Sequence, residues 1–401
     1  SMLTERGLVV LDVGSQFTKC GFAGEGAPRH IIASPPLAKD EDGLLDRHLR
    51  TVFLKLLQVY PKDRKVLLCE NLVAAESSRR RVASLLFEAL QIPSIVFVPS
   101  ALLCMYASGA SSGLVLEMGY SETAVLPIID GIALAHAASF GPLGAAKVHA
   151  CIQDLATKGD EIKVENGTAA ALTLGDLDDI LVRGCFVQPS EPELTEAWLE
   201  SVQPVQFVVP SGLDVTLSPF ARRQVCEVLF GGAVGDAVEP ELSLTTMLLD
   251  TLLQCAVDTR PIIAHHLVLA GGLANLCGLA DRLMKQLNLQ VEQDATYGPI
   301  RALVRTKLTI APPLFPPSCA AWVGGSIIGE LLPAEAALRR DEWLKTKKLP
   351  DWTEPAAPPQ QTAPSRKERL SLRRSSLTPR APTRTSTLTP SLTSPVAPLP
   401  E

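Results

Sequence analysis

The chain contains 401 residues, 46% of them hydrophobic, and carries a formal net charge of −6 at pH 7. This length exceeds the size at which a single hydrophobic core usually stops growing, so we expect two domains or lobes. No apolar run reaches the roughly 18 residues needed to span a bilayer, and the start of the chain lacks the pattern of a signal peptide. We therefore expect no direct membrane insertion.

Nine cysteines are scattered along the chain, and none of them forms a C-x-x-C pair. An odd, dispersed set argues against a disulfide framework and against a zinc site, and it favours a reducing compartment. We therefore expect a soluble protein of the cytoplasm or nucleus.

The first hundred residues predict alternating strands and helices. Apolar residues at helical spacing between Leu45 and Tyr60 predict one helix, and Ser77 and Ser78 are expected to cap a second. A further helix is expected through Tyr106. The strand patterns cover residues 8–13, 17–23, 30–34, 65–70 and 94–100.

The strand pattern begins again with residues 113–119, 123–129 and 131–137. Farther on, "HHLVLAGGLANLCGLADRLMKQL" predicts a strand, a Gly-Gly turn and a helix with its leucines, Leu276 to Leu287, facing inward. A last helix contains Trp322, which we expect in the core. Because strand–hairpin–helix units occur twice, we predict an α/β protein of two related lobes with a cleft between them.

The composition changes after residue 352. Residues 353–401 contain ten prolines and carry a net charge of +4, whereas the preceding residues carry −10. Such a segment cannot bury enough apolar surface to offset its ordering entropy, so we predict a disordered basic tail. A basic tail on an acidic body is more often an interaction tail than a nucleic-acid arm, so we expect no nucleic-acid partner. Ser375 and Ser376 follow two arginines and are predicted phosphorylation sites.

Two hairpin patterns carry the chemistry. Each has an acid, one residue and a glycine after an apolar strand: Asp12 with Gly14, and Glu117 with Gly119. A glycine turn lets the backbone approach a phosphate, and Lys19 can reach the negative charge. The two acids can face each other and hold a hydrated Mg²⁺.

A pair of glycines, Gly271 and Gly272, is expected to give a third close approach at a helix N-terminus, where partial positive charge favours anions. An acid-x-Gly pattern alone is usually only a hairpin turn. Two such hairpins followed by a strand, two glycines and a helix are much more specific for phosphate binding.

Several segments resemble the actin family in the right order. "LDVGSQFTKCGFAGEGAPR" resembles the actin signature, and "MYASGASSGLVLEMGYSETAVLPIIDG" is similar to the segment that leads into the second phosphate loop of actin. "CAVDTR", "LVLAGGLANLCGLADRL" and "AWVGGSI" are similar to later actin segments. The likeness covers about residues 7–352 and implies the fold of actin, sugar kinases and heat-shock ATPases, which consists of two RNase H-like lobes with ATP between them.

The resemblance implies a first lobe of residues 7–109, completed by residues 333–352, and a second lobe of residues 110–332. ATP or ADP, with or without Mg²⁺, is the implied cofactor. The implied nucleotide-binding residues are Asp12, Gly14, Ser15, Gln16, Phe17, Lys19, Glu117, Gly119, Tyr120, Gly271, Gly272 and Leu273, with Asp12 and Glu117 as indirect metal ligands through water.

Departures from the actin pattern argue against catalysis. Ser100 and Ala124 stand where actins have the Gln and His that position the attacking water. The Asp-Gly of the second loop is replaced by Tyr120 and Ser121, and Leu181 and Val182 stand where actins place a Lys and a Glu near the adenine. Since positioning is most of what phosphoryl chemistry needs, we expect a nucleotide that is held and not hydrolysed.

A second departure is a deletion. Between residues 34 and 65 the sequence has room for little more than one helix, whereas actins carry a small subdomain there that the next filament subunit grips. The chain therefore resembles the actin-related proteins found at the pointed end of dynactin. That implies a cytoplasmic, cytoskeletal filament cap with the actin-related protein 1 filament and small pointed-end subunits as partners, and dynein as an indirect one.

Two other functions are compatible with the same family. One is an actin-related subunit of a nuclear chromatin remodeller, which a basic tail supports slightly. The other is a weak ATPase of the actin and sugar-kinase superfamily, for which a catalytic group near Glu117 is missing.

Overall fold

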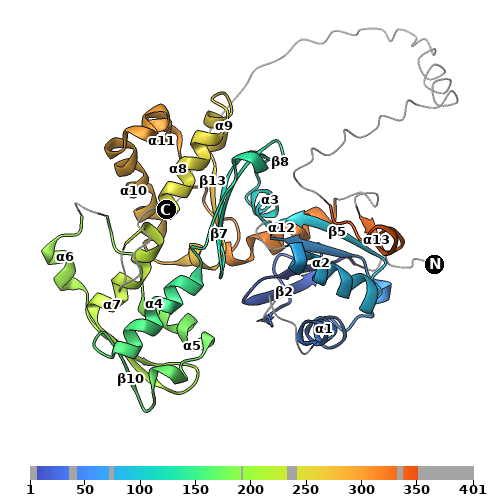
Figure 1. Ribbon diagram of the computed structural model, residues 1–401, viewed down its shortest axis with the longest axis horizontal. Helices are drawn as coiled ribbons and strands as arrows, with labels where there is room; N and C mark the ends of the chain where they lie inside the picture. The colour runs from blue at the N-terminus through green and yellow to red at the C-terminus, as the bar shows by residue number, and fades with distance from the viewer. Residues whose placement is uncertain are drawn as a thin grey trace, which may run out of the picture. The chain divides into compact units, whose positions relative to one another are not determined.

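The computed structural model describes residues 7–35, 43–71, 76–190, 193–232, 242–331 and 337–350 (Figure 1). The predicted tail, with Ser375 and Ser376, lies outside the described residues. No helix in the described segments is long and apolar enough to cross a membrane.

The first sheet has six strands in the order β14-β5-β4-β1-β2-β3. Strands β1, β4 and β5 run parallel, and β2 and β3 are added as an antiparallel hairpin and edge. The continuous apolar composition of β4 and β5 suits strands that are covered on both faces. The bounds are β1 (Val9–Val13), β2 (Phe17–Phe22), β3 (His30–Ala33), β4 (Val66–Glu70), β5 (Ser94–Pro99) and β14 (Leu338–Arg339).

Helical segments cover one face of this sheet. Leu49, Phe53, Leu86 and Phe87 are fully buried there, and Trp343 joins the same core from the end of the described chain. The segments are α1 (Leu44–Arg50), which continues as the π-helical turn η1 (Thr51–Leu56), α2 (Glu76–Ser84) with η3 (Leu85–Ala89), and α13 (Arg340–Thr346).

The second sheet repeats the hairpin arrangement. Its strand order is β13-β6-β7-β8, β13 is parallel to β6, β6 and β7 form an antiparallel hairpin, and β9 also pairs with β7. A separate three-stranded sheet has the order β10-β12-β11. The bounds are β6 (Gly113–Met118), β7 (Thr123–Ile129), β8 (Ile132–Ala133), β9 (Ser139–Gly141), β10 (Ile162–Glu165), β11 (Val205–Val208), β12 (Asp214–Leu217) and β13 (Leu267–Ala270).

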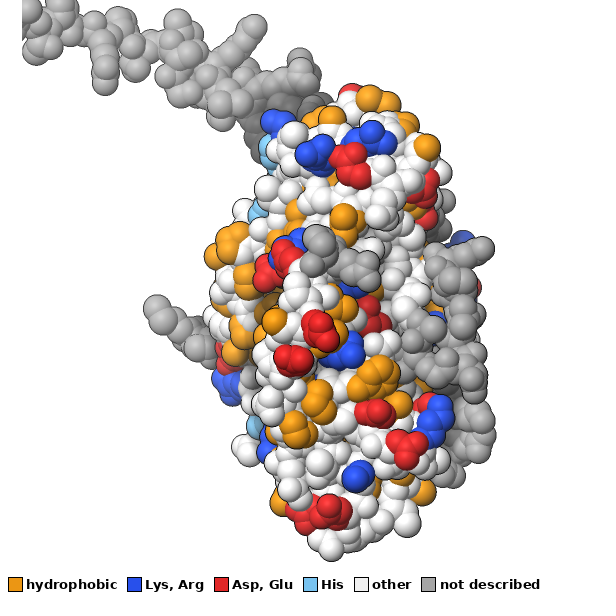
Figure 2. Space-filling view, turned by 90° about the vertical axis from the view of Figure 1, so that its left-hand side faces the viewer, with side chains coloured by type: hydrophobic (Ala, Val, Ile, Leu, Met, Phe, Trp, Pro, Cys, Tyr) orange, Lys and Arg blue, Asp and Glu red, His pale blue; other side chains and the backbone are white. Residues whose placement is uncertain are grey.

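The remaining helices lie around these two sheets, and all of them except α6 contribute buried residues to one core (Figure 1). They are α4 (Ala145–Lys158), α5 (Leu174–Asp179), which continues as the turn η6 (Ile180–Gly184), α6 (Glu196–Ser201), α7 (Pro219–Gln224), α8 (Leu244–Gln254), α9 (Arg260–Ala264), α10 (Leu279–Gln293) and α11 (Arg301–Lys307). On the face shown in Figure 2, acidic and basic side chains are interspersed and hydrophobic ones lie between them.

Helices α3 (Ser100–Ala107) and α12 (Ala320–Gly329) pack closely at the centre of the molecule. A Cβ at Gly324 would lie 1.9 Å from the carbonyl oxygen of Leu103, so only glycine permits this approach. Trp322 is fully buried, as predicted, and its indole N–H donates to the carbonyl of Val10 at 3.1 Å. The α12 helix is thereby fixed to the first strand of the first sheet.

The predicted strands are found within one or two residues of their expected positions, with one exception. Only Ile132 and Ala133 of the expected strand 131–137 are extended, because the chain then turns into a 3₁₀ segment. The capping prediction was also wrong: Ser77 and Ser78 lie inside the first turn of α2. Leu276 precedes α10, whereas Leu279, Leu283 and Leu287 face inward as expected.

The connection between β3 and β4 is short, as the sequence predicts. Residues 36–42 lie outside the described residues, and the rest of the connection contains α1, η1 and a single 3₁₀ turn at Pro61–Asp63. Leu45, Leu49 and Phe53 bury this segment against the first sheet. The described connection therefore forms no subdomain of its own.

Candidate functional site

The first hairpin places a cation beside an acid. Asp12 and Lys19 are directly opposed in the β1–β2 ladder, and their side chains form an ion pair at 2.7 Å while both remain largely buried. Burial would lower the pKa of Lys19, but the carboxylate of Asp12 outweighs it and raises that pKa. The ammonium group is therefore a permanent positive charge in the cleft.

The turn of this hairpin is closed by the N–H of Gly14, which donates to the carbonyl of Phe17 at 3.1 Å. The N–H groups of Ser15 and Gln16 pair with no backbone carbonyl of the described chain. Free amides at a tight turn, with a lysine beside them, are suited to an anion such as a phosphate.

The second hairpin has the same geometry. Glu117 is opposed to Ala124 in the β6–β7 ladder, and the N–H of Gly119 donates to the carbonyl of Glu122 at 2.9 Å. The matching turns explain why both patterns contain a glycine two residues after the acid. The sequence therefore predicted the local structure of both hairpins correctly.

Helix α4 fixes the tip of the second hairpin, which the sequence did not lead us to expect. The N–H groups of Ala145 and Ala146 donate to the carbonyls of Gly119 and Tyr120 at 3.1 and 2.8 Å. A Cβ at Gly144 would lie 2.1 Å from the oxygen of Tyr120, so the approach requires a glycine. The glycine directly before a helical pattern was the available signal.

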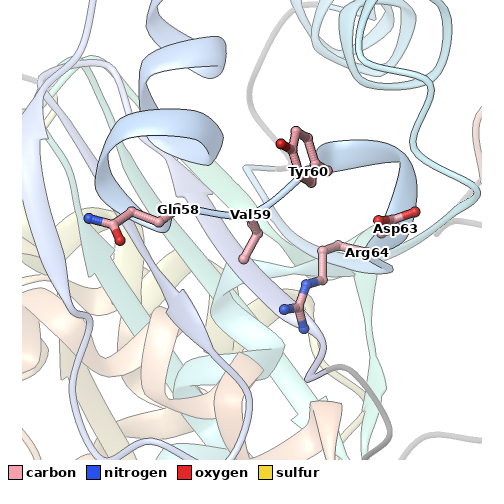
Figure 3. A pocket seen from close by; sticks show the side chains of 5 residues that line it. All are labelled: Gln58, Val59, Tyr60, Asp63 and Arg64. Carbon is pink, nitrogen blue, oxygen red and sulfur yellow. The ribbon is translucent and has the colours of Figure 1, made fainter. Parts of the chain in front are cut away.

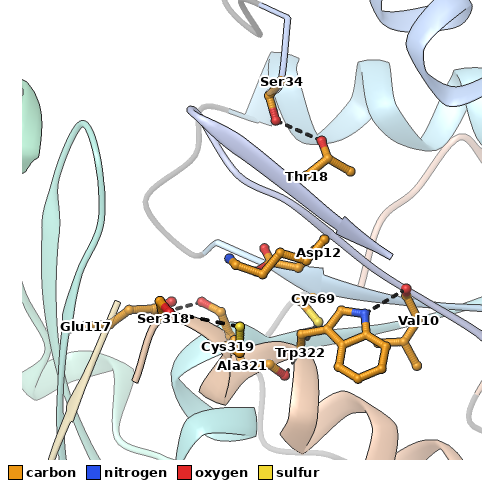
Figure 4. A network of polar contacts seen from close by, with 12 residues as sticks. Val10, Asp12, Thr18, Ser34, Cys69, Glu117, Ser318, Cys319, Ala321 and Trp322 are labelled. Carbon is orange, nitrogen blue, oxygen red and sulfur yellow. Dashed lines mark hydrogen bonds and ion pairs between the residues drawn. The ribbon is translucent and has the colours of Figure 1, made fainter. Parts of the chain in front are cut away.

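Glu117 lies one residue before the end of β6 and is drawn together with Asp12 in Figure 4. The hydroxyl of Ser100, at the start of α3, donates to Oε2 of Glu117 at 2.7 Å. Burial raises the pKa of Glu117 to about 7, and the nearby charge of Asp12 adds to this effect while Lys19 opposes it. Asp12, Lys19 and Glu117 are therefore close enough to act on one another electrostatically, and the prediction that the two acids share a metal ion stays a prediction.

Cys69 lies close to the same groups. Its thiol is buried, burial raises its pKa well above the ordinary value, and the charge of Asp12 raises it further. The thiol donates to the carbonyl of Ala321 at 3.7 Å, so it is a protonated group of the core.

The glycine pair is placed differently from the prediction. Gly271 precedes a 3₁₀ segment of four residues, Gly272–Asn275, which Gly272 begins, and α10 starts only at Leu279. Gly271 has a φ of 89°, and a Cβ there would lie 2.0 Å from the oxygen of Met118. Gly271 therefore permits a close approach between the ends of β13 and β6. A Cβ at Gly272 would meet no atom within 4 Å, and Leu273 is buried in the core.

Tyr120 and Phe17 flank the two hairpin turns. Tyr120 is half-buried and packs edge-on against His149 of α4, with ring centroids 5.7 Å apart. Phe17 is 40% exposed. Two residues that the sequence did not single out also contact the hairpin turns. Asp178 is hydrogen-bonded to the side chain of Gln16, and Asn71 is hydrogen-bonded to the side chain of Glu122.

The residues present fit a magnesium ion only through water. No group of three or more His, Cys, Asp or Glu side chains converges anywhere in the described segments. Asp12 and Glu117 are the acids of the two acid-x-Gly hairpins, and a hard cation that keeps most of its water can be held by so few protein oxygens. Lys19 is the cation beside the first hairpin turn, and the binding of phosphate there stays a prediction.

The pocket drawn in Figure 3 is a separate surface hollow. Gln58, Val59, Tyr60, Asp63 and Arg64 line it, all from the turn that leads into β4. None of the predicted nucleotide-binding residues lines this hollow, so it does not bear on the cleft chemistry.

The two sheets each carry an acid-x-Gly hairpin, β1–β2 in the first and β6–β7 in the second, so the α/β arrangement is duplicated. The family model described as "Actin" matches residues 37–169 and 177–343, and the chain belongs to the actin family. The fold is the actin fold. Among its relatives, actin-like protein 7A of Macaca fascicularis is 24% identical over 363 residues, which cover 80% of this chain and 78% of the relative.

Proposed function

We propose that this actin-family chain is a structural subunit that caps the pointed end of the dynactin filament, and that it is most similar in role to actin-related protein 10, also called actin-related protein 11. The observation that carries the proposal is the short connection between β3 and β4. The resemblance to actin places at this position the subdomain by which one filament subunit engages the next.

A subunit without that subdomain can dock through its opposite end and leave nothing for a further subunit to grip. The described part of the connection is packed down on the first sheet by Leu45, Leu49 and Phe53. Its compactness supports termination of a filament. The partners are then the actin-related protein 1 filament and the small pointed-end subunits, in the cytoplasm, with dynein reached indirectly.

The cleft in this proposal holds ATP or ADP with Mg²⁺ and does not hydrolyse it. Lys19 and the free amides of the first hairpin bind phosphate, and Asp12 and Glu117 face the hydrated ion. The hydroxyl of Ser100 already donates to Glu117, and the side chain of Ala124 has no polar group. Neither can orient a water for attack, so the nucleotide is a structural ligand.

Affinity purification of the full chain from cells at moderate salt, with partners identified by mass spectrometry, tests the proposal. We expect near-stoichiometric actin-related protein 1 and dynactin pointed-end subunits. Recovery of chromatin-remodelling subunits would replace the proposal with the nuclear alternative, and recovery of neither set would contradict it.

A second experiment tests capping itself. Purified chain should block growth at the pointed end of actin-related protein 1 filaments without severing them. A chimaera that carries an actin subdomain between β3 and β4 is the matched control, and it should bind the filament end but permit further growth. Equal blocking by both proteins would show that the deletion is not the cause.

A further inference from the structure

Two side-chain hydrogen bonds cross the cleft between the lobes. The side-chain amide of Gln16, in the first hairpin turn, donates to the carboxylate of Asp178 on α5. The side-chain amide of Asn71, directly after β4, donates to Glu122 in the second hairpin turn at 2.7 Å. Each hairpin turn is thus joined to the opposite lobe.

The two acceptors, Asp178 and Glu122, lie on parts of the second lobe that make further contacts there. The other oxygen of Asp178 lies 3.2 Å from Nε2 of His149, which is 3% exposed, although the pair is not aligned as a hydrogen bond. The His149 ring packs against Tyr120. Glu122 belongs to the hairpin whose tip α4 fixes through Gly119 and Tyr120.

Asp178 needs little reorganisation to receive the amide of Gln16, because its other oxygen already contacts His149. A carboxylate that is already positioned loses less rotamer freedom on accepting a hydrogen bond, and an ionised acceptor makes a stronger one. The Ser100–Glu117 bond adds a third link, from the start of α3 to β6. Both hairpin turns, and the strand β6 that leads into the second turn, are therefore joined by side-chain hydrogen bonds to elements of the other predicted lobe.

We propose that Gln16, Asn71, Glu122 and Asp178 form a clasp that keeps the two lobes closed without the help of nucleotide. The lobes then keep one relative position whether the cleft is filled or empty. Because the clasp joins the two hairpin turns that would face the phosphates, we expect nucleotide exchange to be slower while it is closed. The clasp does not depend on the chain being a filament cap.

The test compares small-angle scattering and hydrogen exchange of the full chain before and after nucleotide is removed with EDTA and apyrase. We expect the wild type to keep its radius of gyration and the protection of residues 14–17 and 119–122. An Asn71→Ala/Asp178→Ala double variant should expand and lose this protection once nucleotide is removed. Mg·ATP is the probe that should restore the closed form.

The matched control is Asp179→Ala, one residue along α5, because Asp179 pairs with Arg183 within its own lobe at 2.7 Å. It should behave as the wild type does. Asn71 is exposed, so Asn71→Ala alone gives a folded variant for exchange measurements, and it should release a fluorescent ATP analogue several-fold faster.

Opening of the wild type on nucleotide removal would overturn the clasp. So would a double variant that stays closed, or unchanged release of the analogue from Asn71→Ala. None of these readouts involves filament partners, so failure of the clasp and failure of the capping role are separable.

Discussion

At the scale of single residues, Gly144 determines how the second hairpin is held. Its missing side chain lets the start of α4 reach the carbonyls of the hairpin tip, since a Cβ would lie 2.1 Å from the oxygen of Tyr120. Gly144→Ala should therefore lower the free energy of unfolding by about 2 kcal/mol, because backbone cannot yield as a flexible side chain does.

The control for this substitution is Gly175→Ala in α5, where the nearest heavy atom to a new Cβ would be 3.7 Å away. Alanine favours a helix over glycine, so this variant should be neutral or slightly more stable. Denaturant unfolding of both variants checks the prediction, and equal stability would mean that the α4 contact has room to adjust.

Glu117 gives a prediction on pH. Its pKa is raised to about 7 by burial, so between pH 4.5 and 7 the folded protein binds more protons at this site than the unfolded chain does. The contribution of Glu117 to stability is thus fully present below pH 4.5 and is lost as the pH rises to 7. Glu117→Gln should be about 2 kcal/mol more stable than the wild type at pH 8 and similar to it at pH 5.

Chemical denaturation without added nucleotide or Mg²⁺ checks this difference, since a bound cation would favour the ionised carboxylate. Gln can still accept the hydrogen bond from Ser100, so the substitution removes the charge and keeps the contact. A constant offset between the two proteins at both pH values would contradict the raised pKa.

At the scale of elements, α13 belongs to the first lobe's core although it lies at the end of the described chain. Trp343 is fully buried, stacks on Phe87 with centroids 5.6 Å apart and donates to Glu88 at 3.1 Å. Trp343→Ala should cost about 3–5 kcal/mol, the usual effect of removing a buried large aromatic. Leu344→Ala is the control, since Leu344 is 42% exposed, and thermal unfolding should separate the two clearly.

Some elements could be predicted from the sequence and others could not. Apolar runs predicted the strands of both hairpins, because a buried strand needs a continuous apolar stretch and a turn needs its glycine. The segment after Gly272 was harder to predict. Its apolar spacing looks helical from Leu276 onward, but Gly278 has a φ of 82° and sits against the carbonyl of Val187, so α10 starts later.

The contacts between lobes could not be predicted from local pattern. Gln16 and Asp178 are 162 residues apart, and nothing in either neighbourhood indicates that they meet. Ser100 and Ala124 were readable as departures from the actin pattern, yet the bond from Ser100 to Glu117 depends on how α3 leaves β5. Pairings of this kind follow from the packing of whole elements.

At the scale of the whole molecule, hydrolysis would require groups from both lobes to act on one water. Lys19 and Asp12 come from the first sheet and Glu117 from the second. The positions that the resemblance to actin assigns to water orientation hold Ser100, whose hydroxyl donates to Glu117, and Ala124. Since positioning and charge stabilisation supply most of the rate in phosphoryl transfer, a nucleotide in this cleft should persist.

Phosphate release from Mg·ATP by the purified chain should therefore not exceed that of a Lys19→Ala variant. A conventional actin measured in parallel provides the positive control. The informative contrast is Glu117→Ala, which removes the buried carboxylate: turnover in the wild type that this substitution abolishes would mean that the cleft is catalytic. If the purified chain contains bound nucleotide and shows no turnover, the nucleotide is a structural ligand. The ligand and the hydrogen bonds between the lobes would then hold the lobes in one relative position.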